Sequence, residues 1–156
     1  TISDVGLDSY TLAEGPARFE AGTPAIGEAI GLGAAADYLR EIGMDRIEAH
    51  ERWLTERMYD ELTRIPVVEV YGPEPGQRIG IIAFNVGGLH HHDVALALDV
   101  SADIMVRSGH HCALPLAKNI LHRQGSVRAS LYLYNTEGEV ERLASALREI
   151  AGSQAK

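Results

Sequence analysis

The residues most able to do chemistry stand together in the stretch IMVRSGHHCALP, residues 104–115. It holds Cys112, the only cysteine among the 156 residues, directly preceded by His110 and His111. A thiol acts as a nucleophile in its thiolate form, and neighbouring imidazolium or guanidinium groups lower its pKa. Because His110, His111 and Arg107 could supply this effect, the stretch predicts a reactive thiol.

Two other interpretations of Cys112 stay open. Free cysteine is among the most buried residue types, so a lone cysteine can be structural. Its place in a loop, after Gly109 and before Pro115, favours reactivity instead. A metal site would draw on the seven histidines, including the three at 90–92. Consecutive donors do not easily turn toward one ion, so we expect no metal and interpret residues 90–92 as a solvated helix start.

Arg128 is the second candidate, in the stretch SVRASLYLYNT, residues 126–136. On a predicted strand between Val127 and Ala129 it can be a surface charge at a sheet edge. Alternatively, Arg128 could bind a small carboxylate through two parallel hydrogen bonds. The planar guanidinium is better suited to this geometry than an ammonium group is.

Composition limits the class of protein. The chain has 46% hydrophobic residues, a net charge of −8 and a pI near 5.3. The hydrophobic content is enough for one compact domain, and the acidic balance argues against nucleic-acid binding. Apolar runs fall well short of the roughly 20 residues of a membrane helix, and no secretory signal is recognisable. We therefore expect a cytoplasmic protein with no membrane contact. A first residue other than Met also fits a piece of a longer polypeptide.

The elements that must position these residues begin with a helix predicted over 24–42. Thr23 followed by Pro24 is typical of an N-cap and first helical position. Gly27 and Gly31 stand four residues apart within this helix, which predicts very close packing against another element. Residues 1–22 show no sustained periodicity and are expected to be an irregular lead-in segment.

The rest of the chain predicts a small sheet with helices on one face. Asp45 with Glu48, and Thr136 with Glu139, are capping boxes for a second and a last helix. Between these helices we expect, in order, strands 67–71 and 79–86 joined by GPEPGQR, helix 92–99, strand 103–107, a short helix and strand 127–134. The prediction is an α+β fold with a mainly antiparallel sheet, forming a single small domain over 23–156.

Four stretches, taken together and in order, resemble a known family. They are RFEAGTPAIGEAIGLGAA (18–35), IAFNVGGLHHHDVALALD (82–99), VRSGHHCALP (106–115) and VRASLYLYNTEGEVERL (127–143). They closely resemble the C-terminal part of group II, or SUF-type, cysteine desulfurases, which are related to selenocysteine lyases. The resemblance implies the small C-terminal domain of the aspartate-aminotransferase-like fold (fold type I) of enzymes dependent on pyridoxal 5'-phosphate (PLP).

The resemblance also implies an activity and site residues. These enzymes are homodimers that convert L-cysteine to L-alanine and leave a persulfide on an enzyme cysteine. Cys112 would be the sulfur-accepting nucleophile and His110 its neighbour in the same motif. Arg128 would hold the substrate carboxylate, with Arg107 near the substrate. Gly22 and Thr23 would reach the cofactor phosphate of the other subunit.

The family's Schiff-base lysine belongs to a large domain that precedes the part resembled here. The only lysines of this chain are Lys118 and Lys156, and neither stands in the family's lysine motif. We therefore expect an incomplete enzyme, inactive alone, that needs a PLP-binding large domain in cis or in trans. Since Cys112 is the only thiol, its sulfur, or selenium from L-selenocysteine, would pass to an acceptor protein for iron–sulfur cluster assembly.

Two alternatives remain beside the desulfurase. The first is a stand-alone persulfide carrier without PLP chemistry, which would have no use for the carboxylate and phosphate contacts of Arg128 and Thr23. The second is a non-catalytic interaction domain in which Cys112 is buried.

Overall fold

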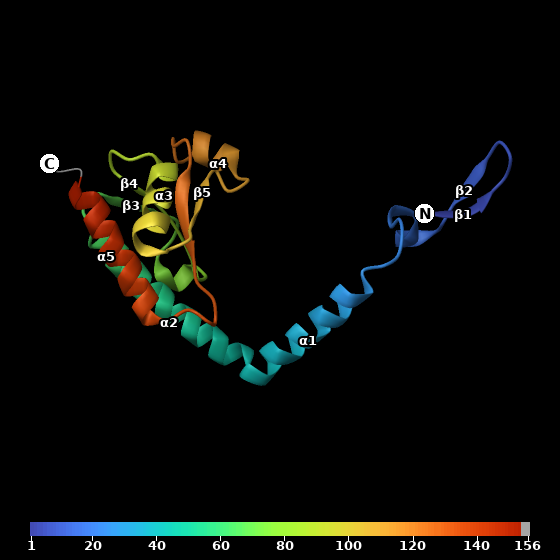
Figure 1. Cartoon of the computed structure of the whole chain (residues 1–156), viewed down its shortest axis with the longest axis horizontal. Helices are drawn as coiled ribbons and strands as arrows, with labels where there is room; N and C mark the ends of the chain where they lie inside the picture. Colours follow the sequence, from blue (N-terminus) through green and yellow to red (C-terminus); the bar gives the residue numbers. More distant parts are fainter. Residues whose placement is uncertain (154–156) are drawn as a thin grey trace. The chain divides into compact units, whose positions relative to one another are not determined.

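The computed structural model describes residues 1–153 and divides into two compact units, Thr1–Gly43 and a second unit that begins at Met44. The sequence instead places a boundary at residue 22. The helix expected over 24–42 therefore groups with the N-terminal segment and not with the remaining elements. Each unit is described by itself below (Figure 1).

The first unit contains two strands that the sequence did not predict. β1 (Ile2–Val5) pairs antiparallel with β2 (Tyr10–Leu12), and a short 3₁₀ helix, η1 (Gly15–Phe19), follows. The expectation of an irregular segment over 1–22 was therefore wrong. Strands this short, with every side chain of β1 and β2 exposed, carry no one-sided apolar alternation that periodicity could detect.

Helix α1 (Ile26–Ile42) begins two residues later than its predicted first residue, Pro24. Ala25 occupies the N-cap position and no side chain caps the helix. The residue before a proline is pushed away from helical backbone angles, and the Ile26 N–H instead bonds to the Pro24 carbonyl at 2.8 Å. The Thr23 and Pro24 prediction for the helix start was wrong. No residue of α1 is buried.

The second unit follows the predicted order of elements. It consists of α2 (Met44–Thr63), β3 (Val68–Tyr71), η2 (Pro75–Gln77), β4 (Ile81–Val86), α3 (His91–Ala102), β5 (Arg107–Gly109), α4 (Leu114–Asn119), β6 (Ser126–Ser130) and α5 (Glu137–Ser153). The four strands form one sheet in the order β3-β4-β6-β5, and every neighbouring pair is antiparallel. The expected α+β fold is confirmed.

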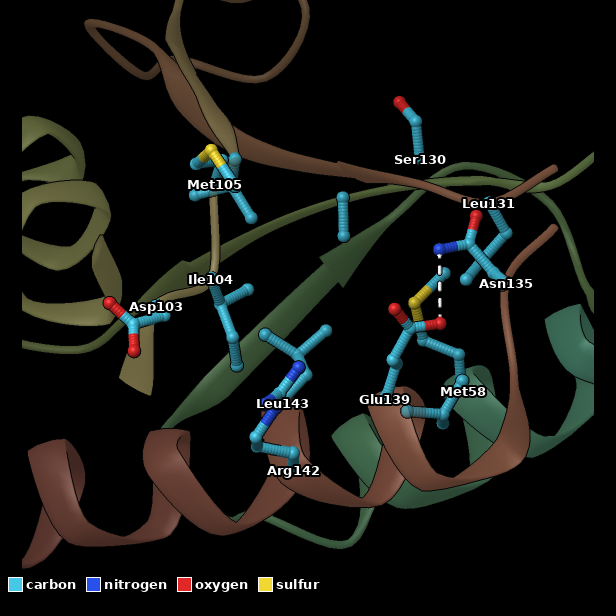
Figure 2. A pocket seen from close by; sticks show the side chains of 13 residues that line it. Met58, Asp103, Ile104, Met105, Ser130, Leu131, Asn135, Glu139, Arg142 and Leu143 are labelled. Atoms are coloured by element: carbon cyan, nitrogen blue, oxygen red, sulfur yellow. Dashed lines mark hydrogen bonds between the residues drawn. The ribbon is translucent and has the colours of Figure 1, made fainter. Parts of the chain in front are cut away.

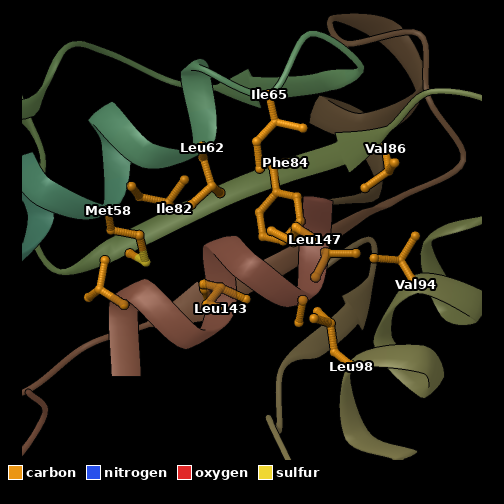
Figure 3. Packing of buried hydrophobic residues seen from close by; sticks show 14 of the residues in the cluster. Met58, Leu62, Ile65, Ile82, Phe84, Val86, Val94, Leu98, Leu143 and Leu147 are labelled. Atoms are coloured by element: carbon orange, nitrogen blue, oxygen red, sulfur yellow. The ribbon is translucent and has the colours of Figure 1, made fainter. Parts of the chain in front are cut away.

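One face of this sheet carries the hydrophobic core (Figure 3). Side chains alternate along β4, so that Ile82, Phe84 and Val86 are buried while the residues between them are less covered. Val127 of β6 lies opposite Phe84 and is also fully buried. Helices α2, α3 and α5 cover this face with further buried side chains: Leu54, Met58, Leu62, Val94, Leu98, Val140, Leu143 and Leu147.

Two predicted strands differ from the structure. The strand expected over 103–107 overlaps β5 only at Arg107, and the strand expected over 127–134 ends at Ser130. Asp103 ends α3 in the left-handed region, at φ 52°, with its N–H bonded to the carbonyls of Leu98 and Asp99. Residues 103–106 therefore connect the end of α3 to β5 and are not part of a strand.

The two predicted capping boxes have different outcomes. The Thr136 N–H donates to the Glu139 carboxylate at 2.7 Å, which confirms the cap of α5. Helix α2 begins at Met44, so Asp45 lies inside its first turn, and the Glu48 carboxylate accepts a hydrogen bond from Arg52 at 2.5 Å. The Asp45 cap was therefore wrong, although the helix it predicted is present.

No helix within residues 1–153 has the length and apolar content needed to span a membrane.

Candidate active site

The second face of the sheet is polar and carries the predicted site residues. Register places Tyr71 of β3 opposite Ala83 of β4, Ala83 opposite Arg128 of β6, and Arg128 opposite Arg107 of β5. Residues directly opposite each other in antiparallel strands point to the same face. Since the residues between them along β4 and β6 are core residues, this row lies on the face away from α2, α3 and α5. Arg107 and Arg128 are therefore neighbours on one surface.

The thiol loop follows β5 and turns over this face. His111 and Cys112 have φ of 52° and 59°, two successive left-handed residues. This backbone conformation costs about 1–2 kcal/mol per non-glycine residue and often accompanies functional sites. Cys112 is exposed, and the Arg107 Nη2 lies 3.7 Å from its sulfur. The structure thus presents a free thiol with a guanidinium as its polar neighbour.

His111 turns its ring away from solvent and toward β6. Its Nε2 lies 3.1 Å from the carbonyl oxygen and 3.1 Å from the hydroxyl of Ser126. Burial lowers the pKa of His111, the Ser126 hydrogen bond opposes this shift, and the charges of Arg128 and Arg107 add to it. Because a carbonyl only accepts, Nε2 carries the proton of the neutral ring. His111 therefore anchors the thiol loop as a neutral donor.

A cavity of about 320 Å³ lies between the thiol-bearing segment and the polar face. Its lining includes Tyr71, Ala83 and Arg128 from the sheet and His110, His111, Leu116 and Leu121 from the segment. The half-buried Arg128 has an Nε atom that is fully covered and has no hydrogen-bond partner among the described residues. Because Arg128 lines the cavity, its guanidinium favours a ligand with a carboxylate or similar acceptor.

The three histidines at 90–92 do not form a solvated helix start as a group. His90 is the N-cap of α3, His91 is buried at 7% exposure, and the His92 Nδ1 lies 2.7 Å from the Ser108 hydroxyl. Burial lowers the pKa of His91, and the neighbouring histidines lower it further. Within residues 1–153 no cluster of three or more His, Cys, Asp or Glu side chains is arranged to hold a metal ion.

The remaining predicted residues stand outside this arrangement. Gly22 and Thr23 are exposed in the first unit, Gly22 with φ of 84°. Lys118 is exposed near the end of α4, and Lys156 lies outside the described residues. The site built by residues 44–153 therefore contains Cys112, Arg107, Arg128, His110 and His111, and no buried lysine.

A second hollow of about 180 Å³ lies on the core side of the sheet, between α5 and the chain that enters β5 (Figure 2). Met105, Arg142 and Glu139 line it, and the Glu139 carboxylate accepts a hydrogen bond from Asn135 at 3.3 Å. It contains none of the predicted site residues, so the candidate site is the cavity below the thiol loop.

Sequence reasoning missed residues that support the site. The Ser126 carbonyl accepts a hydrogen bond from His111. The Asn85 side chain donates a hydrogen bond at 2.9 Å to the carbonyl of Gly125, the residue just before β6. Both lie on the same side of the sheet as Tyr71 and Arg128, Asn85 within a predicted strand and Ser126 one residue before another. That period-two pattern of polar residues was the available signal.

Known proteins resemble this chain over most of its length. The chain matches the aminotransferase class-V family over residues 1–143. A probable cysteine desulfurase of Methanothermobacter thermautotrophicus is 47% identical over 154 residues, covering 97% of this chain and 38% of the relative. A probable cysteine desulfurase of Pyrococcus abyssi is 49% identical over 154 residues, with 98% and 38% covered.

Solved structures give the same result. An apo cysteine desulfurase from Thermococcus onnurineus NA1 has a TM-score of 0.85 and 49% identity, with 98% of this chain and 38% of that chain covered. The cysteine desulfurase CsdA from Escherichia coli has a TM-score of 0.82 and 31% identity, with 98% and 37% covered. The chain thus spans a little over a third of the length of these relatives. Since the family match extends over most of its length, this chain belongs to the class-V aminotransferase family.

Proposed function

We propose that this chain is the C-terminal, thiol-bearing part of a group II cysteine desulfurase. Its curated relatives are probable cysteine desulfurases at 47% and 49% identity. The SUF-type assignment rests on the thiol-loop stretch VRSGHHCALP and the three stretches collinear with it. The substrate would be L-cysteine, or L-selenocysteine, and the product L-alanine.

The observation that carries this proposal is that Arg128 lines the cavity below the thiol loop and stands opposite Arg107 in the sheet. An amino acid substrate has a carboxylate that fits a guanidinium in two parallel hydrogen bonds. Arg107, opposite Arg128 in the sheet, contacts the Cys112 sulfur. A substrate held by its carboxylate at Arg128 is therefore bound next to the thiol.

In the proposed reaction the Cys112 thiolate attacks the sulfur of L-cysteine. An S–S bond forms as the C–S bond of the substrate breaks, and its electron pair stays on the carbon, which takes a proton to give L-alanine. The Arg107 guanidinium stabilises negative charge on the sulfur by a charge-assisted hydrogen bond. Because Cys112 is the only cysteine, the persulfide sulfur leaves to the thiol of another protein, in a cytoplasmic route to iron–sulfur clusters.

The described residues do not by themselves form a PLP site. Lys118 is exposed on α4, and no lysine in the described part of the chain is among the residues that line the cavity. PLP, when bound, supplies the electron sink for the substrate carbon. We infer that a lysine-bearing large domain, in cis or in trans, holds it, and that Gly22 and Thr23 serve its phosphate in a homodimer.

The experiment is alanine release from L-cysteine with added PLP and reductant. We compare this chain alone with a chimera in which it replaces the matching segment of the Pyrococcus abyssi relative. The chain alone should release no alanine, whereas the chimera should release it and form a persulfide on Cys112. Cys112→Ser should abolish both, and Arg128→Gln should raise KM by about tenfold or more, as expected from losing a charge-assisted pair.

The matched control is Arg57→Gln, since Arg57 also has a covered Nε without a partner but lies on α2, outside the cavity lining. Its kinetic constants should equal those of the parent chimera. Alanine release by the chain alone would contradict the need for a second domain. A chimera that accepts sulfur from a persulfide donor but makes no alanine would instead support the stand-alone carrier, which the exposure of Cys112 favours.

A further inference from the structure

The thiol-bearing segment, residues 110–124, is held to the sheet by little apolar burial. Ala117 is the only buried residue of α4, while Leu114, Leu116 and Ile120 are 52%, 47% and 69% exposed. Burial of apolar area normally provides most of the free energy that holds an element in place. Polar contacts must therefore contribute an unusual share of the positioning of this segment.

Besides the contact of His111 with Ser126 on the interior strand β6, polar contacts lie at both edges of the sheet. At the β5 edge, Arg107 contacts the Cys112 sulfur. At the β3 edge, Arg123 at the far end of the segment binds Glu69 and Tyr71. Since the strand order is β3-β4-β6-β5, the segment crosses the polar face and is attached on both sides of the cavity.

The far attachment is a connected network. The Arg123 Nη2 and Nε donate to one Glu69 oxygen at 2.8 and 3.2 Å, and Nε also donates to the Tyr71 hydroxyl at 3.1 Å. Tyr71 donates to the same Glu69 oxygen at 2.7 Å, and Asn85 bridges the Tyr71 hydroxyl and the Gly125 carbonyl at 3.1 and 2.9 Å. Hydrogen bonds from Tyr71, then from Arg123, lower the pKa of Glu69, so its carboxylate is charged at neutral pH.

Backbone hydrogen bonds connect this attachment to the thiol. The Arg123 N–H bonds to the Ala117 carbonyl at 2.9 Å, the Ala117 N–H to Ala113 at 3.1 Å, and the Ala113 N–H to His110 at 2.8 Å. Residues 110–123 thus form one hydrogen-bonded unit that contains Cys112. A change in where Arg123 is held therefore changes where the sulfur is held.

We propose that Arg123, with Glu69 and Tyr71, is a positioning residue for sulfur transfer. It fixes the far end of the thiol-bearing segment so that the Cys112 sulfur stays beside Arg107. This inference deepens the proposed function and rests on it, because the position of the Cys112 sulfur is important for catalysis only if the chain transfers sulfur. The position itself can be measured on this chain alone.

The measurement is the charge selectivity of Cys112 alkylation. The second-order rate constants for iodoacetate and iodoacetamide are determined for the folded chain, and their ratio is divided by the same ratio for free cysteine. Both reagents react with the thiolate, so the ratio does not depend on how much thiolate is present. A sulfur held beside the Arg107 guanidinium should prefer the anionic reagent.

Arg123→Gln should lower this ratio by about threefold, the scale on which an exposed ion pair shifts an equilibrium. Hydrogen exchange at the amides of Ala113, Ala117 and Ile120 should accelerate by a similar factor, with exchange in β4 unchanged. Arg57→Gln is the matched control, because Arg57 also forms an exposed pair between two elements, 2.9 Å from Glu137. It should leave both readouts at the wild-type value.

Two further variants separate positioning from general electrostatics. Glu69→Gln removes a negative charge, so a purely electrostatic effect would raise the ratio, whereas loss of the attachment lowers it. Arg123→Lys keeps the ion pair but loses the geometry that reaches Tyr71, and should restore part of the ratio.

An unchanged ratio in Arg123→Gln, or a raised ratio in Glu69→Gln, would overturn the proposal. Neither result would affect alanine release by the chimera, so failure of this inference is distinguishable from failure of the proposed function. A chimera that makes no alanine, beside a lowered ratio in both variants, would leave Arg123 as the residue that positions the thiol of a sulfur carrier.

Discussion

Single residues decide which group lies next to the thiol. The sequence offered two histidines and one arginine as its neighbours, and the structure places the Arg107 guanidinium at the sulfur while His111 binds Ser126. His111 and Cys112 both need left-handed backbone angles, and the adjoining segment keeps them there. The strained backbone of His111 and Cys112 therefore lies where the sulfur atom must be accessible.

The buried His91 predicts a stability that depends on pH. Burial lowers its pKa, followed by the effects of His90, His92 and His111, while Asp93 opposes them. The unfolded chain has an ordinary histidine pKa of about 6.5 and binds the proton first as the pH falls. The free energy of unfolding should therefore decrease as the pH drops below about 6.5, since the unfolded state then holds more protons.

This dependence can be measured by urea denaturation at pH 7.5 and pH 5.5. His91→Gln should lose less stability between these two values than the wild-type protein, because one group that protonates on unfolding has been removed. Equal losses in the two proteins would show that His91 does not contribute.

At the scale of elements, Gly109 and Gly125, which flank the thiol-bearing segment, lie close to each other and to His91 of α3. A Cβ atom on Gly125 would lie 2.1 Å from the His91 Nε2 and 2.8 Å from the Gly109 carbonyl carbon. Gly125→Ala should therefore destabilise the protein by about 2 kcal/mol or more, the cost of overpacking a tight site. Gly138→Ala on α5 is the control, because a Cβ there meets nothing within 4 Å. Denaturation curves that show equal stability for the two variants would refute this packing argument.

The last helix depends on its capping box. The Glu139 carboxylate accepts hydrogen bonds from the Thr136 N–H and from Asn135. Glu139→Ala should lower the free energy of unfolding by about 1 kcal/mol, the usual contribution of a helix cap. Glu141→Ala removes a carboxylate two residues along, whose ion pair with Arg57 is long at 3.9 Å, and should have a smaller effect. Equal losses in chemical denaturation would argue that the charge and not the cap is responsible.

At the scale of the whole molecule, every residue of the hydrophobic core belongs to the second unit, and none in the first unit is buried. A fragment over 44–156 should therefore fold with the stability of the full chain. The first unit exposes many large apolar side chains, among them Ile2, Tyr10, Phe19, Ile26, Ile30 and Leu32. The full chain should self-associate with rising concentration, whereas the fragment should remain monomeric, since large exposed apolar patches favour association.

Denaturation curves and sedimentation velocity of the two proteins test this expectation. A fragment that unfolds or that associates as strongly as the full chain would contradict it. The predicted close packing at Gly27 and Gly31 is relevant here, because a Cβ at either glycine meets nothing within 4 Å in this chain.

The sequence by itself determined the order of elements in the second unit, the α+β fold, and the cap at Thr136 and Glu139. These features depend on local signals: helical periodicity, β-branched runs, capping residues and short collinear motifs. The reactivity of Cys112 stays a prediction. Only the tertiary structure decided that Tyr71, Arg128 and Arg107 share a cross-strand row, that His91 is buried, and that Arg123 attaches the thiol-bearing segment to β3. Strand register and burial arise from packing between residues far apart in the chain, which no local pattern contains.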